Sequence, residues 1–105
     1  LMINKHGIGF NPGFDYFANH TKERGIPFLI CLHLEKREAE KKQFNEQGEE
    51  ILNYCKTKQI KVITGLEVGE NDTHYRDDIH LNEQGQKLWA GVLLNEIKKT
   101  EITCL

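Results

Sequence analysis

The sequence predicts an α/β fold with a parallel sheet, and three observations support this prediction. Residues 28–34 are almost continuously apolar and too few for a helix core, which is typical of a strand covered on both faces. Residues 35–58 are rich in Glu, Lys and Gln and carry an apolar stripe with helical spacing, which predicts one long helix. Residues 60–64 form a second, β-branched strand directly after it, so the order is that of a strand–helix–strand crossover unit.

The remaining elements extend the same pattern along the chain. A short apolar start at residues 1–3 is a further candidate strand, and a helix is expected at residues 14–24, ended by Gly25. Residues 66–81 are polar and predict an irregular loop, after which Asn82 is the expected N-cap of a last helix. The apolar side of that helix is expected in the core: Leu88, Trp89, Val92, Leu93 and Ile97.

These elements amount to two or three strands and three helices. Parallel strands need neighbouring strands on both sides and helices on both faces, so two or three strands are too few for a complete parallel sheet. We therefore expect residues 1–105 to form a single domain or the C-terminal part of a larger one. In the second case the other strands lie outside this sequence.

The composition argues against several classes of partner. The 105 residues include 14 Lys and Arg against 16 Asp and Glu, a net charge of −2, so no basic face for nucleic acid is indicated. No apolar run approaches the roughly 18 residues that a transmembrane helix needs. The three cysteines have no CxxC spacing, so neither a disulfide framework nor a zinc knuckle is indicated.

The densest polar cluster is the loop at residues 74–82, which follows the second strand. Ligands of open parallel sheets bind beyond the carboxyl ends of the strands, so a site is expected in this loop. Asp77 and His80 are three residues apart, a spacing that on a turn lets the carboxylate accept from Nδ1 while Nε2 faces a nucleophile. The structural alternative is that Asp77 and Asp78 form a turn and His80 caps it.

The pattern around this pair extends further. Residues 77–86 are DDIHLNEQGQ, and LWA follows at 88–90. This stretch resembles the last conserved block of the SGNH (GDSL-type) hydrolases, in which D-x-x-H-L-N precedes a glycine and the C-terminal helix. The resemblance implies a flavodoxin-like three-layer fold, of which this chain is a C-terminal part, and ester hydrolysis through an acyl-enzyme. It further implies that His80 is the general base, that Asp77 orients it, and that no metal or other cofactor takes part.

The chain departs from the family in one essential respect: it contains no serine, whereas the family's nucleophile is a serine in a G-D-S-type block. The resemblance therefore implies that a missing N-terminal segment or a partner chain supplies the serine, and that this chain alone is inactive. Residues 69–72 spell the family's G-x-N-D block, but they precede Asp77 too closely and favour an ordinary turn. Gly7 and Asn11 are the remaining candidates for oxyanion or substrate contacts.

Other interpretations stay open. The loop carries four side chains of metal-binding type: His74, Asp77, Asp78 and His80. One short loop rarely supplies a whole ligand set, so no metal is predicted. His33, at the end of the first strand, is expected to bond to backbone, with approach to the same loop as the alternative.

The resemblance implies that the substrate is an ester of a small molecule, a lipid or a carbohydrate. In a different class, the chain would be a non-catalytic α/β module that pairs through its sheet edge with another chain or a second copy.

Overall fold

The computed structural model describes residues 12–104, and its contacts divide the chain into two compact units. Among the described residues, one unit combines residues 12–32 with Phe44–Ile63, and the other combines His33–Gln43 with residues 64–104. Gly7 and Asn11, the candidates for oxyanion or substrate contacts, lie outside the described residues, as does the candidate strand at residues 1–3.

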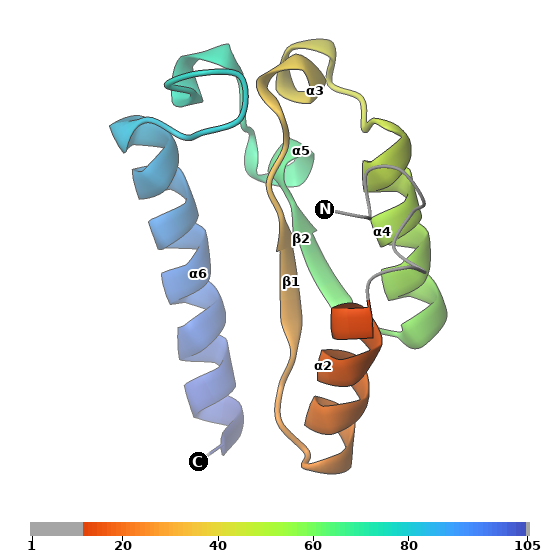
Figure 1. Cartoon of the computed structure of the whole chain (residues 1–105). Helices are drawn as coiled ribbons and strands as arrows, with labels where there is room; N and C mark the ends of the chain where they lie inside the picture. The colour runs from red at the N-terminus through yellow and green to blue at the C-terminus, as the bar shows by residue number, and fades with distance from the viewer. Residues whose placement is uncertain (1–11, 105) are drawn as a thin grey trace. The chain divides into compact units, whose positions relative to one another are not determined.

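The first unit holds two helices and the sheet. Helix α2 spans Pro12–Glu23, strand β1 spans Leu29–Leu32, helix α4 spans Glu46–Lys58 and strand β2 spans Lys61–Thr64. The two strands are neighbours in a two-stranded parallel sheet (Figure 1). The predicted first helix and both predicted strands are therefore confirmed. Gly25, with φ of 65°, ends α2 in the left-handed region that glycine adopts without strain.

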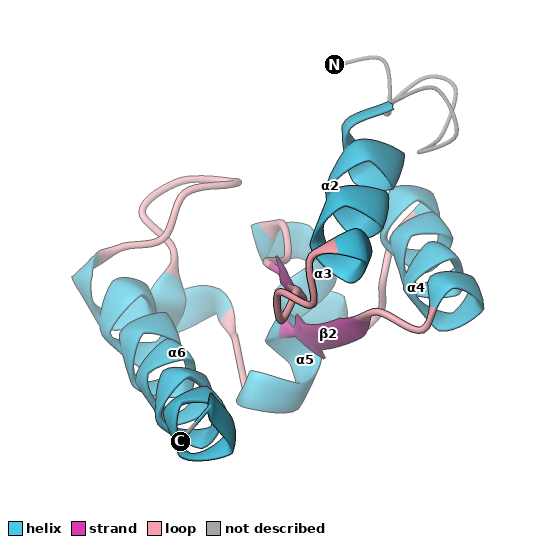
Figure 2. Ribbon diagram, turned by 90° about the horizontal axis from the view of Figure 1, so that it is seen from below, coloured by secondary structure: helices cyan, strands magenta, loops and turns pink. Residues whose placement is uncertain are grey.

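Helices α2 and α4 lie side by side in this unit (Figure 2). The rings of Phe14 and Tyr54 meet edge to face with centroids 5.6 Å apart. The Tyr54 hydroxyl donates to Asp15 Oδ1 at 2.7 Å. Burial, together with this bond, raises the pKa of Tyr54 to about 12, so the hydroxyl remains protonated and keeps donating.

The side chains of β1 differ in exposure. Phe28 and Ile30 line an apolar pocket together with Phe14 and Phe17 of α2, so their side chains face that helix. Cys31 alternates to the opposite face of the strand and is exposed. The prediction of a strand covered on both faces is therefore wrong at Cys31.

The prediction of a single helix over residues 35–58 is wrong, because the structure has two helices there, α3 at Lys36–Lys41 and α4. Lys42 adopts a left-handed φ of 54° and ends α3. The side chain of Asn45 accepts from the N–H of Gly48 at 2.8 Å and begins α4. An apolar stripe can continue across such a break, but a residue that caps the backbone locally competes with an uninterrupted helix.

The second unit holds α3, α5 at Gly65–Val68, the 3-10 helix η2 at Asp72–His74, and α6 at Glu83–Cys104. Residues 66–81 are therefore more ordered than predicted. Thr64 and Glu67 form a capping box at the start of α5: Thr64 N–H donates to Glu67 Oε1 at 2.7 Å and Glu67 N–H to Thr64 Oγ1 at 3.2 Å. Gly69, with φ of 89°, ends α5.

The core of the second unit includes Leu34, Tyr75 and Trp89, all buried. The prediction that Trp89 belongs to the core is confirmed. It is wrong for Leu93 and Ile97, which are exposed. Trp89 lies near the start of α6, where the helix packs on the rest of its unit, whereas Leu93 and Ile97 lie one and two turns further along.

Residues 12–104 thus form a small mixed α/β structure with a two-stranded parallel sheet and five α-helices, α2–α6. The α/β class is confirmed at this level. The expected number of three helices is wrong, because the long helix is divided and α5 is an additional short helix. No helix within residues 12–104 has both the length and the apolar character that a membrane span requires.

Candidate functional site

The Asp77–His80 loop lies between η2 and α6 and is closed by backbone hydrogen bonds. Tyr75 and Leu81 pair as an antiparallel bridge, and Arg76 N–H donates to the carbonyl of His80 at 2.8 Å. Asn82 N–H donates to the carbonyl of His74 at 2.9 Å. These bonds make residues 77–80 the tip of a short hairpin-like loop.

Asn82 anchors this loop to the last helix. Its side-chain oxygen accepts from Gly85 N–H at 3.0 Å, as an N-cap does, and its amide nitrogen donates to the carbonyl of Thr73 at 2.8 Å. The predicted N-cap is confirmed. Gly85 has no room for a side chain, because a Cβ there would collide with the carbonyl oxygen of His74 and lie 2.7 Å from Leu81 Cδ2.

The carboxylate of Asp77 is in direct contact with the imidazole of His80, as their spacing predicts. His80 Nδ1 lies 2.8 Å from Oδ2 and 3.0 Å from Oδ1, and both side chains are about half exposed. Oδ1 also accepts from the N–H groups of Ile79, at 2.9 Å, and His80, at 2.6 Å. These two backbone bonds, followed by the imidazole, lower the pKa of Asp77 to about 2, so the carboxylate is ionised at neutral pH.

This contact determines which nitrogen of His80 is available. A carboxylate accepts hydrogen bonds only, so Nδ1 carries the proton and the lone pair of a neutral ring lies on Nε2. Within residues 12–104, no hydrogen bond to Nε2 is present. The arrangement can therefore take a proton from a group that approaches Nε2, while Asp77 stabilises the imidazolium that forms.

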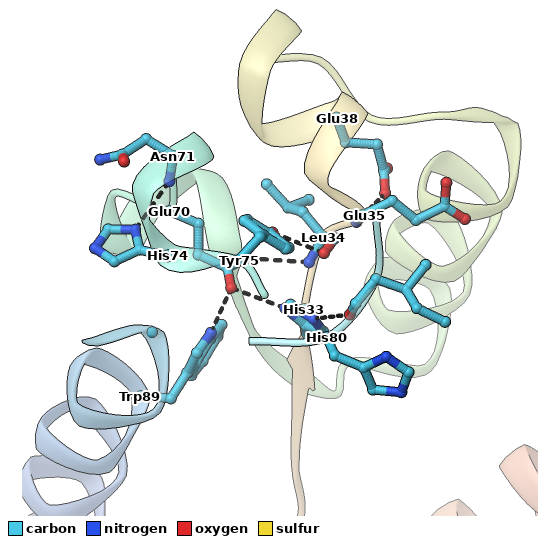
Figure 3. Close-up of polar contacts among 12 residues, drawn as sticks. His33, Leu34, Glu35, Glu38, Glu70, Asn71, His74, Tyr75, His80 and Trp89 are labelled. Carbon is cyan, nitrogen blue, oxygen red and sulfur yellow. Dashed lines mark hydrogen bonds and ion pairs between the residues drawn. The ribbon is translucent and has the colours of Figure 1, made fainter. Parts of the chain in front are cut away.

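A buried carboxylate lies behind this loop in the same unit, and sequence reasoning missed it. The side chain of Glu70 is fully buried and accepts three hydrogen bonds (Figure 3). Leu34 N–H donates to Oε1 at 3.0 Å, while His33 Nδ1 and Trp89 Nε1 both lie 2.8 Å from Oε2. Burial alone would raise the pKa of Glu70, but these bonds outweigh it and hold the pKa below its usual value of 4.5.

His33 connects this carboxylate to the loop. Its Nε2 lies 2.8 Å from the carbonyl oxygen of Ile79, and its ring stacks on Tyr75 with centroids 5.5 Å apart. The predicted bond to backbone is confirmed, and that backbone belongs to the Asp77–His80 loop. The segment after His33 is fixed too: Tyr75 donates its hydroxyl proton to the carbonyl of Leu34 at 2.7 Å, and Lys36 N–H donates to the carbonyl of Asp78 at 2.8 Å.

The G-x-N-D stretch at residues 69–72 has the turn character that was predicted for it. Gly69 ends α5, and the Asn71 side chain caps η2 by accepting from Thr73 N–H at 2.9 Å. What the sequence did not indicate is the direction of Glu70, because its partners His33 and Trp89 are 37 and 19 residues away.

A metal site in the loop finds no support among the described residues, where no cluster of three or more ligand side chains is present. His74 does not join the Asp77–His80 pair. Its Nδ1 accepts from the N–H of Asn71 at 3.0 Å, so the lone pair on that nitrogen is occupied (Figure 3). The loop therefore brings together two of the four candidate ligands, Asp77 and His80.

Comparisons with known proteins do not extend this description. No family model, curated protein or solved structure matches the chain.

Proposed function

We propose that this chain supplies the histidine and aspartate of a serine ester hydrolase of the SGNH type. The observation that carries the proposal is the contact of Asp77 with Nδ1 of His80, which leaves Nε2 directed away from the carboxylate on an exposed loop. The α/β character of the structure and the D-x-x-H-L-N resemblance add support. The flavodoxin-like three-layer sheet belongs to the proposal as well, with its further strands outside the described residues.

In the proposed reaction, His80 Nε2 removes the proton from a serine hydroxyl as the serine oxygen bonds to the ester carbonyl carbon. The tetrahedral intermediate collapses, the bond to the alcohol oxygen breaks, and the alcohol leaves with the proton from Nε2. Water then repeats the sequence on the acyl-serine and releases the acid. Throughout, Asp77 holds the Nδ1 proton and stabilises the imidazolium.

The serine itself is not in this sequence, so the proposal requires a second segment, either in a longer form of the protein or in a partner chain. The oxyanion donors would come from that segment or from this chain, in which Gly7 and Asn11 are the candidates. The expected substrates are esters of small molecules, lipids or carbohydrates, and p-nitrophenyl acetate is a simple probe for the class.

The test measures hydrolysis of p-nitrophenyl acetate by the full-length gene product. We expect His80→Ala to lower kcat by about 10⁴-fold and Asp77→Asn by a comparable factor, as in other triads. Matched controls are His20→Ala, which removes an imidazole outside the loop, and Asp78→Asn, which changes the neighbouring carboxylate. Activity that survives His80→Ala unchanged, or a full-length product without esterase activity, would overturn the assignment.

A second candidate is a non-catalytic module that pairs through its sheet. The observation in its favour is that β1 and β2 each have one neighbour within residues 12–104, so each presents an edge there. Light scattering of the purified protein decides this point. A dimer whose population rises with protein concentration would support pairing of two copies, and a monomer at high concentration would contradict it.

A further inference from the structure

His33 has a hydrogen-bond acceptor opposite each ring nitrogen. Nδ1 lies 2.8 Å from the Glu70 carboxylate and Nε2 lies 2.8 Å from the carbonyl oxygen of Ile79. The carbonyl has no proton to give, and the lowered pKa of Glu70 makes that side chain a carboxylate, which only accepts, at neutral pH. A neutral imidazole carries one N–H, so both contacts are hydrogen bonds only when the ring is an imidazolium.

The carbonyl that His33 holds belongs to the peptide unit between Ile79 and His80. The N–H at the other end of the same peptide unit donates to Asp77 Oδ1. The unit is therefore held from both ends, by the ring of His33 at its oxygen and by the carboxylate of Asp77 at its nitrogen. Hydrogen bonds arranged in such a chain polarise and strengthen one another.

We propose that His33, as an imidazolium bound to Glu70, is a positioning residue that holds the Ile79–His80 peptide and with it the Asp77–His80 pair. We call His33, Glu70 and the Ile79 carbonyl the His33 clamp. Its hydrogen bonds do not depend on the proposed function, whereas the role of positioning a catalytic pair rests on that function. When the imidazolium loses a proton, Nδ1 keeps its hydrogen and still donates to the charged carboxylate of Glu70. Nε2 is then left with a lone pair that faces the carbonyl oxygen of Ile79. The loop then loses one of its attachments.

The surroundings of His33 favour the imidazolium. The hydrogen bond to Glu70 raises the pKa of His33 above the usual 6.5 and outweighs burial, which lowers it. The hydrogen bond to the Ile79 carbonyl and the charges of Glu70 and Glu38 raise the pKa further. Tyr75 stacks on the ring, and burial raises the pKa of its hydroxyl, so it adds no charge. The His33 side chain is 35% exposed, so it can exchange its proton with solvent.

The first experiment observes the clamp without using activity. The full-length gene product is labelled with 15N-histidine, and the ring and backbone nitrogens are followed by NMR from acid to alkaline pH. We expect both ring nitrogens of His33 to be predominantly protonated at pH 6.5, below its raised pKa, and the backbone amide of His80 to shift in step with the alkaline titration of His33. That shift should disappear in His33→Gln and persist in the control His20→Gln.

The second experiment measures p-nitrophenyl acetate hydrolysis against pH. We expect His33→Gln to lower kcat by about 10- to 100-fold with little change in KM, as is usual when a group that orients a catalytic residue is lost. The wild type should also lose activity at the alkaline titration of His33, and the variant should lack that limb. A variant with the wild-type kcat and pH profile would overturn the positioning role.

The two experiments separate this inference from the proposed function. A protein without esterase activity refutes the function, while the NMR titration still decides whether the clamp exists. Conversely, a His33 ring with one protonated nitrogen at pH 6.5, or a His80 amide that does not follow His33, refutes the clamp even in an active hydrolase. If His33→Gln fails to fold, the wild-type titration alone supports or refutes the clamp.

Discussion

Replacing Glu70 with glutamine tests the buried network with the smallest change of shape. Both carboxylate oxygens accept hydrogen bonds, Oε1 from Leu34 N–H and Oε2 from His33 and Trp89. An amide has one oxygen, so whichever way the side chain of Glu70→Gln turns, its NH2 group faces at least one N–H donor.

The expected cost follows from these contacts. In the better orientation the amide oxygen keeps His33 and Trp89, and the N–H of Leu34 is left buried without an acceptor, which costs about 1–3 kcal/mol. The two remaining bonds lose the charge of the carboxylate, which weakens each by about 1 kcal/mol. We therefore expect the free energy of unfolding to fall by about 3–5 kcal/mol, a large share of the stability of a small domain.

Urea unfolding followed by the fluorescence of Trp89 measures this loss. Trp89 is the single tryptophan of the chain, and its indole N–H bonds to the substituted side chain, so the signal reports on the network itself. The control is Glu83→Gln, because the Glu83 side chain is 82% exposed and pairs with Lys87 on the surface of α6. A loss below about 1 kcal/mol in Glu70→Gln, or an equal loss in the control, would refute the assignment of a buried, charged carboxylate.

Two further predictions concern pH and helix packing. The Glu70–His33 pair should contribute most to stability between about pH 4.5 and 6.5: its contribution falls in acid as Glu70 is protonated at its lowered pKa, and in alkali as His33 deprotonates at its raised pKa. Urea unfolding across pH should show both declines, and an equal alkaline decline in His33→Gln would contradict this. Gly85→Ala should lower Tm because its Cβ would collide with the carbonyl of His74, whereas Gly91→Ala, with no atom within 4 Å, should stabilise α6 by about 0.8–1.0 kcal/mol. Equal melting temperatures for the two variants would show that the close approach at Gly85 is absent.

Much of the candidate loop was predictable because its contacts are short in sequence. Asp77 and His80 are three residues apart, and so are Asn82 and the Gly85 N–H that it caps. A side chain that meets a partner within one turn has few alternatives, so spacing alone indicates the contact. The cap that Asn45 forms with the N–H of Gly48 is equally local and begins α4. The prediction of one long helix was wrong there because the apolar stripe continues across the break.

The buried network behind the loop was not predictable. Glu70 lies in a stretch that spells an ordinary turn, and nothing in its immediate neighbours distinguishes it from the exposed Glu67. Its three donors come from residues 33, 34 and 89, which approach it only after the unit has folded. His33 was expected to bond to backbone, but which backbone was decided by the packing of the loop against the segment after β1.

The sequence by itself therefore determined the strands, the capped start of α6 and the contact of Asp77 with His80, because each depends on the order of residues within a few positions. The tertiary structure alone decided that Glu70 is buried, that His33 bridges it to Ile79, and that the apolar side of α6 is covered at Trp89 but exposed at Ile97. The physical reason is that desolvation and hydrogen bonding across tens of residues depend on what packs against a group, and local spacing carries no record of it.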